Sequence, residues 1–271
     1  MFKKIKPKLV SWAKDNLPMW AIKILVPVYS FLMGGSVLRS VLPLQISLKK
    51  DSYKGKRCFI IGGGPSILEH DLSFLSNEHT FIVNKGFTLK ERGLEKATFY
   101  GVSDKHAYEN YGHEIDPGYI EHFITVGNVP WGLDVKSLST FESYTTHDWF
   151  KKLHKGFWQD DITKPLSGSY TVVLYMLQIA VWLGFKEIYF IGIDNNFTGK
   201  NMHWYKDSQR EKDNIKLWST DNTAMTSIAF AKVDKILRKK GVRIYNAGVG
   251  GNLHTIPRVD YNELFENKNK D

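Results

Sequence analysis

Three consecutive glycines after a short apolar run are the residues with the clearest chemical meaning in this sequence. Gly62-Gly63-Gly64 follows Phe59-Ile60-Ile61, and Pro65 and Ser66 come next. A continuous apolar run is typical of a buried parallel strand, and glycines let the backbone turn sharply and approach a ligand closely. Proline suits a first helical position, where free N–H groups attract a phosphate. The stretch therefore predicts a nucleotide-binding loop between a strand and a helix.

A tight strand-to-helix turn without a ligand is the other interpretation of these glycines. The spacing differs from the dinucleotide fingerprint, because Ile67 stands where the third glycine of G-x-G-x-x-G belongs. No Gly-Lys-Ser/Thr follows, so the loop is not of the Walker type. Both interpretations stay open from these residues alone.

Polar side chains also recur where the other predicted strands end. They are Asn84, Lys85, Ser103, Asp104, Asp194, Asn195, Asn196 and Asn246. Ligands of α/β sheets bind beyond the carboxyl ends of the strands, so these residues are candidates for one site. A carboxylate there could be a base, a ribose clamp or a Mg²⁺ ligand, and the amides could bind base or sugar hydroxyls. Each residue alone is also a common turn residue.

Two loops supply further candidates. His203 and Tyr205 lie in an aromatic, glycine-bearing loop soon after Asp194, and a histidine there could be a general base. Its alternative is a loop histidine packed on Trp204. Arg258 could hold a phosphate or form a salt bridge with a carboxylate at a helix end. The other histidines lack the spacing of zinc ligands, so we expect no metal site of that kind.

Strands and helices alternate along the chain and predict an α/β fold. The predicted strands are 59–61, 80–83, 97–102, 123–126, 186–193 and 242–245, and the predicted helices are 170–183, capped by a serine, and 223–240. Residues 127–165 read as loops and small elements. Such alternation favours a Rossmann-like, mostly parallel sheet with helices on both faces. We place this domain at residues 54–266, after a leader at 1–53.

The net positive charge of the chain lies in the leader and the few residues after it. Residues 1–57 hold 12 of the 37 Lys and Arg and 2 of the 28 Asp and Glu, whereas the remainder is close to neutral. This distribution argues against a nucleic-acid groove on the domain. A basic, aromatic, amphipathic segment fits an anionic membrane surface, here through residues 1–50. A helical arm packed on the domain or a subunit, and a true membrane span, are the alternatives.

The single cysteine, Cys58, excludes a disulfide framework and suits a reducing compartment. Its apolar neighbours favour an inert core residue. Together with the leader, this predicts a cytoplasmic protein at the inner face of the cell membrane.

Several segments resemble known families. Residues 59–66, with Asp71, resemble the opening of the family-42 bacterial sialyltransferases, and Ser167-Gly168 with residues 184–194 resembles their second signature. Asn84 falls where these enzymes have a donor-binding asparagine. The carboxyl end, residues 244–265, is more similar to the domain-of-unknown-function-115 proteins, also called 6-hydroxymethylpterin diphosphokinase MptE-like. The resemblance covers roughly residues 56–265.

The resemblance implies a nucleotide site made of Gly62 to Ser66, Asn84, Asp104, Ser167 and Gly168. Three departures accompany it. Gly63 and Gly101 stand where sialyltransferases have asparagines, and no histidine precedes the last long helix, where their catalytic histidine falls. We therefore expect His203 to be the catalytic base, with Asp194 as the second candidate.

These observations favour a glycosyltransferase that uses a nucleotide sugar, such as a CMP-linked nonulosonic acid, in surface glycan or lipopolysaccharide synthesis. The acceptor would be a glycan or a lipid-linked molecule, bound with help from Asn195, Asn196, Tyr205, Asn246 and Arg258. The sequence assigns no certain cofactor to this reaction, and a second copy of the chain is a further candidate partner. One alternative is an MptE-like diphosphokinase that transfers pyrophosphate from ATP to a pterin alcohol, with Mg²⁺ on Asp104 and Asp194. Another is a non-catalytic nucleotide-binding scaffold.

Overall fold

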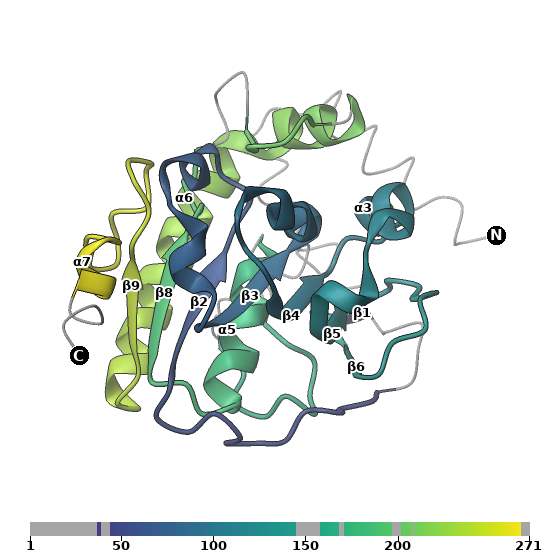
Figure 1. Cartoon of the computed structure of the whole chain (residues 1–271), viewed down its shortest axis with the longest axis horizontal. Coiled ribbons are helices and arrows are strands. Elements are labelled where there is room, and N and C mark those ends of the chain that lie inside the picture. Colours follow the sequence, from purple (N-terminus) through teal and green to yellow (C-terminus); the bar gives the residue numbers. More distant parts are fainter. Residues whose placement is uncertain are drawn as a thin grey trace, which may run out of the picture.

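The fold is built on one parallel sheet, seen in a computed structural model that describes residues 37–38, 44–144, 158–167, 171–196, 202–207 and 209–266. Seven strands lie in the order β6-β5-β4-β3-β2-β8-β9, and every neighbouring pair is parallel (Figure 1). Their bounds are β2 Arg57–Ile61, β3 His79–Val83, β4 Ala97–Val102, β5 Ile120–Val126, β6 Leu138–Phe141, β8 Glu187–Ile191 and β9 Arg243–Asn246. The predicted Rossmann-like α/β class is therefore confirmed.

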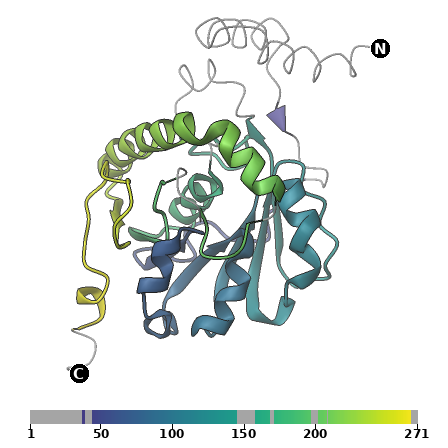
Figure 2. The ribbon, with the colours of Figure 1, turned by 90° about the horizontal axis from the view of Figure 1, so that it is seen from above.

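The helices lie on both faces of the sheet. One face carries α5 (Val172–Trp182) and α6 (Gln209–Lys239), and Figure 2 shows α6 running along that side. The other face carries α3 (Lys105–Tyr111), α7 (Glu263–Glu266) and short 3₁₀ helices. Those 3₁₀ helices that pack there include η2 Pro65–Glu69, η3 Leu72–Leu75 and η4 Asn84–Arg92.

Alternate residues of the central strands point to opposite faces, as a pleated sheet requires. In β2, Cys58 and Ile60 belong to the core under α5 and α6, while Phe59 and Ile61 belong to the core on the other face. Because both faces are covered, the strand is apolar at successive positions, which is the pattern that identified it. Burial also raises the pKa of the Cys58 thiol, and this cysteine is a core residue.

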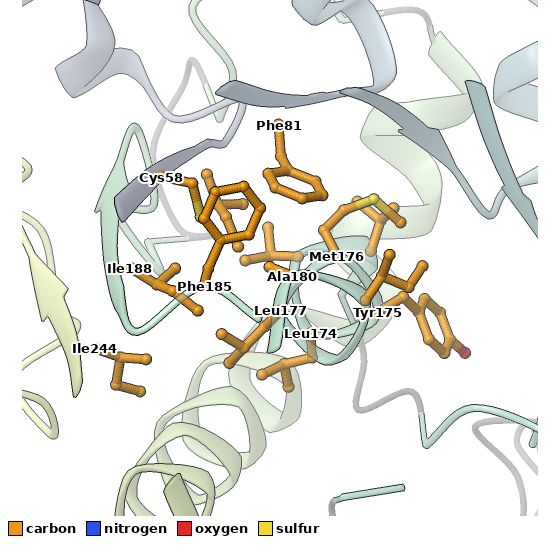
Figure 3. Packing of buried hydrophobic residues seen from close by; sticks show 14 of the residues in the cluster. Cys58, Phe81, Leu174, Tyr175, Met176, Leu177, Ala180, Phe185, Ile188 and Ile244 are labelled. Carbon is orange, nitrogen blue, oxygen red and sulfur yellow. The ribbon is translucent and has the colours of Figure 1, made fainter. Parts of the chain in front are cut away.

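Helix α5 is apolar around most of its circumference because it lies between the sheet and α6. Its side chains Met176, Leu177 and Ala180 are buried and lie beneath Phe81, Cys58 and Phe185 (Figure 3). The predicted serine cap is wrong: Thr171 caps the helix and accepts from the backbone N–H of Val173 at 3.3 Å.

Other differences from the predicted elements have simple causes. The sequence reading missed β6, because a four-residue strand at the edge of a sheet gives little periodicity. It also placed the start of α6 too late, since the first half of that helix is polar and breaks the apolar pattern. Among the described residues, no helix combines the length and the apolar character needed to cross a bilayer.

Residues just before the predicted boundary at position 54 pack on the domain. Gln45 bridges to Thr140, Leu48 is buried in the core, and Tyr53 stacks on Phe185 with ring centres 4.9 Å apart. The strand β1 (Val37–Leu38) pairs with β7 (Ser143–Tyr144). The described residues from Gln45 on therefore belong with the domain, and most of the predicted leader lies outside the described residues.

The packing of α5 explains one departure from the sialyltransferase pattern. Gly101 is buried in β4, and a Cβ at this position would lie 2.2 Å from the sulfur of Met176. An asparagine cannot fit there while Met176 occupies that space. Gly101 therefore serves the packing of α5 on the sheet.

Candidate functional site

The site forms where the strand order reverses, between β2 and β8. The chain runs outward from β2 to β6 and then returns to place β8 on the other side of β2. Open α/β sheets bind ligands at this switch point, beyond the carboxyl ends of the strands. The loop after β2 holds the three glycines, and the loop after β8 holds Gly192 and Asp194.

The glycines let these two loops touch. The N–H of Gly64 donates to the carbonyl of Gly192 at 2.7 Å, and that of Gly62 donates to the carbonyl of Ile191 at 2.9 Å. A Cβ on Gly62 would lie 2.4 Å from the Gly192 oxygen, and one on Gly64 would lie 2.6 Å from Asp194 Cγ. Gly62 and Gly64 thus serve contact within the chain.

Asp194 joins the two loops through Ser66. Its Oδ2 accepts from the backbone N–H of Ser66 at 3.0 Å, and its Oδ1 accepts from the Ser66 hydroxyl. The carboxylate is a structural clamp on the glycine loop in this arrangement. That engagement favours His203 over Asp194 as the base.

Most backbone N–H groups of the predicted phosphate-binding loop already have hydrogen-bond partners within the protein. The backbone N–H groups of Gly62, Gly64 and Ser66 donate hydrogen bonds to acceptors within the protein, and Pro65 has no N–H. Only the Gly63 N–H lacks a partner among the described residues. The predicted helix is also the five-residue 3₁₀ helix η2, too short for an appreciable dipole.

His203 lies against the remaining glycine. The N–H of Trp204 donates to the Gly63 carbonyl at 3.0 Å and fixes the 202–207 segment over the glycine loop. A Cβ on Gly63 would lie 2.8 Å from His203 Cδ2 and 3.6 Å from both His203 Nε2 and Tyr205 Cε1. The imidazole thus fills the space that a side chain at position 63 would need.

Asp207 orients His203. Its Oδ1 is hydrogen-bonded to His203 Nδ1, and its side chain is 2% exposed. The Tyr205 ring stacks on the imidazole at 4.8 Å with an interplanar angle of 3°. His203 Nε2 has no hydrogen-bond partner among the described residues. A carboxylate on one ring nitrogen fixes the tautomer and leaves the other nitrogen to accept a proton.

Sequence reasoning missed Asp207. The four-residue spacing from His203 brings side chains together in a helix, but these two residues lie outside the described helices. Only the folded loop shows that they meet.

The predicted nucleotide-binding residues differ in their availability. Asn84 follows β3 as the first residue of η4 and has a positive φ of 52°, and its amide has no hydrogen-bond partner among the described residues. Asp104 is exposed and caps α3, accepting from the N–H groups of His106 and Ala107. Ser167 is buried with its backbone tied to Gln178, and Gly168 lies outside the described residues.

The predicted substrate-binding residues mostly brace loops. The Asn195 amide donates to Thr223 O and Ser227 Oγ in α6, whereas Asn196 is exposed. Buried Asn246 donates to Leu253 O and accepts from the Gly248 N–H. The Arg258 guanidinium donates to the carbonyls of Gly248 and Gly250 and forms no salt bridge with any residue that the structure describes. Of this set, Tyr205 lies nearest the candidate base.

The loop after β9 packs against the loop after β8. The Asn252 N–H donates to Asp194 O at 2.6 Å, and Gly251 packs on the Asp194 backbone. His70 connects the loop after β9 to η2, because its ring nitrogens lie 2.8 Å from Ser66 O and 3.0 Å from Ala247 O. Three loops from β2, β8 and β9 are thus held together around Asp194.

A metal site is not evident in the described part of the chain. Across those residues, no three His, Cys, Asp or Glu side chains are grouped so that they could hold an ion.

No family model and no curated protein matches this chain. Among solved structures, it is similar to a MAf glycosyltransferase from Magnetospirillum magneticum AMB-1, with 16% identity and a TM-score of 0.49. That match covers 79% of this chain and 35% of the other, so the chain spans about a third of that protein's length. It is also similar to the sialyltransferase CstII from Campylobacter jejuni, solved with CMP-3FNeuAc, at 18% identity and a TM-score of 0.40, covering 75% and 85% of the two chains. Similarity at this level assigns no function, which depends on the site itself.

Proposed function

We propose that this protein is a glycosyltransferase that moves a sugar from a nucleotide donor to a hydroxyl acceptor. One observation carries the proposal: His203, oriented by Asp207, presents a free Nε2 beside Gly63 at the switch point of the sheet. A base in that position faces the place where α/β folds bind nucleotides. The sequence resemblance to the family-42 sialyltransferases points to the same class of reaction.

The reaction is a direct displacement in this proposal. The acceptor oxygen forms a bond to the anomeric carbon as the bond from that carbon to the phosphate oxygen breaks. His203 Nε2 takes the acceptor proton, and Asp207 stabilises the resulting imidazolium. The nucleotide leaves with one more negative charge on its phosphate.

The donor class follows from the resemblance of the glycine loop and is a proposal as well. A CMP-linked nonulosonic acid is the first candidate donor, and a surface glycan or a lipid-linked glycan is the candidate acceptor. Asn84 is the residue best placed to bind the nucleotide, since its amide is not used by the described residues of the fold.

A thermal-shift screen tests the proposal first. The purified chain is melted with CMP, CDP, UDP, GDP or ATP, each with and without Mg²⁺. A ligand that binds only the folded state stabilises it and so raises the melting temperature. At a ligand concentration a hundredfold above the Kd, the stabilisation is about 2.7 kcal/mol. We expect stabilisation by CMP or CDP without metal.

Other outcomes of the screen would change the assignment. Stabilisation by ATP only with Mg²⁺ would favour the diphosphokinase, although its two candidate ligands, Asp104 and Asp194, are each engaged in local hydrogen bonds. UDP or GDP would keep a glycosyltransferase with another donor. Silence from every nucleotide would contradict the proposal and leave a scaffold role.

We further propose that the leader holds the protein on the inner face of the cell membrane. Residues 1–36 carry six lysines and one aspartate, with aromatic residues among them. Because residues from Gln45 on pack against the domain, the informative deletion is residues 1–36. We expect the full chain to sediment with phosphatidylglycerol-containing vesicles and the deletion to stay in the supernatant. Vesicles of phosphatidylcholine alone are the control, and sedimentation of the deletion with anionic vesicles would contradict this assignment.

A further inference from the structure

Lys85 follows β3 directly and reaches the cluster that holds the candidate base. Its ammonium nitrogen lies 5.8 Å from the centre of the Tyr205 ring and 5.6 Å from that of Tyr111. Tyr205 in turn stacks on His203, and both rings pack against Gly63. Lys85, Tyr205, His203 and Gly63 therefore form one contiguous group.

Within the described part of the chain, no carboxylate pairs with the Lys85 ammonium. No ion pair joins it to any residue in the described ranges, although other lysines form them, such as Lys90 with Asp116 at 2.9 Å. Aromatic rings attract a cation through their quadrupole but do not neutralise it. Lys85 as a whole residue is half-buried. An anion that enters the site would meet an uncompensated positive charge.

The proposed reaction needs such a charge. Negative charge develops on the leaving phosphate, and electrostatic stabilisation at that atom is worth most in a partly desolvated site. The backbone groups that the glycine loop offers are largely consumed, since Gly64 and Ser66 donate to Gly192 and Asp194. Arg258 is also occupied, because its guanidinium holds the carbonyls of Gly248 and Gly250.

We propose that Lys85 binds the donor phosphate and stabilises it as the nucleotide leaves. This inference rests on the proposed function and names a further residue for it. The four-carbon stem lets the ammonium move from the two rings onto a phosphate oxygen, and an ammonium is a common phosphate ligand. Tyr111 and Tyr205 hold the cation at the site until the donor arrives.

Lys85→Met is the decisive variant. Methionine keeps an unbranched apolar stem on the tyrosine rings and removes the charge. We expect the Kd of the nucleotide that stabilises the wild type to rise roughly tenfold to a hundredfold, the value of one hydrogen bond to a charged group. Lys85→Arg should restore most of this affinity. Binding of the corresponding nucleoside, measured by competition against the nucleotide, should stay unchanged because it lacks the phosphate.

Lys56→Met is the matched control. Lys56 makes the same kind of contact, 5.7 Å from the centre of the Tyr53 ring, but it precedes β2 at the opposite end of the sheet. Its removal should leave nucleotide affinity unchanged. If Lys85→Met binds the nucleotide with the affinity of the wild type, Lys85 is not a phosphate ligand. The same conclusion follows if the variant loses affinity for the nucleoside and for the nucleotide by the same factor. If the wild type binds no nucleotide at all, the proposed function fails, and the role of Lys85 fails with it.

Discussion

Replacing His203 by alanine should lower turnover by at least about a hundredfold, and up to about ten-thousandfold, while nucleotide affinity changes little. The range is that of a lost general base. His203 Nε2 is free to take the acceptor proton, whereas the loop that would hold the nucleotide is fixed by backbone hydrogen bonds. The measurement is nucleotide release from the nucleotide sugar whose nucleotide stabilises the wild type, with binding followed by calorimetry.

Two further variants make that result specific. His203→Gln keeps a polar side chain over Gly63 but cannot take the proton, so it should be as inactive as the alanine variant. His254 is exposed in the loop after β9, and His254→Ala should retain full turnover. Wild-type turnover in both His203 variants would remove this residue from the mechanism.

Replacing Gly62 by alanine should cost about 3 kcal/mol of unfolding free energy and remove nucleotide binding. The added methyl group would lie 2.4 Å from the Gly192 oxygen and 2.8 Å from Ile193 Cγ1. The first of these is backbone held in the β8 loop, so it cannot swing away as the end of a flexible side chain can. For a domain of this size, such a loss lowers the melting temperature by roughly 6 to 12 °C.

Gly132 offers a matched control for the same substitution. A Cβ at Gly132 meets nothing within 4 Å, and its hydrogen bond uses the backbone N–H, which alanine keeps. Gly132→Ala should therefore melt within about 1 °C of the wild type. Equal stability of the Gly62 and Gly132 variants would show that the two loops separate easily, contrary to their observed packing.

The fold could be predicted from the sequence because the central strands are buried on both faces. Apolar runs such as Phe59-Ile60-Ile61 and Ala97–Val102 have no other explanation in a chain with this many charges. The sequence also predicts the glycine loop, but not the contacts that two of its glycines make within the chain. Gly62 and Gly64 accommodate the β8 loop, and a sequence cannot show which distant backbone will pack on a glycine.

The site could be predicted only as a set of strand ends. His203 is indicated by its chemistry and Lys85 by its place at a strand end. The contacts of His203 with Asp207 and of Lys85 with Tyr205, however, depend on how one loop folds over another. Asn246 and Arg258 have the side chains of ligand-binding residues and are used instead to shape the β9 loop. Residue type and position at a strand end therefore locate the site, and hydrogen bonding decides which side chains are left for a ligand.

The central place of β2 has a consequence for synthesis of the chain on the ribosome. Between Ile61 and the first residue of its neighbour β8 lie 125 residues, 62–186. At a synthesis rate of about 5 to 20 residues per second, one edge of β2 stays unpaired for roughly 6 to 25 s until β8 is made. During that time an apolar strand edge is open to wrong pairing, and the loops of the site have not yet met. A stalled or truncated chain that ends before β8 should therefore depend on chaperones for its solubility and be unable to bind a nucleotide.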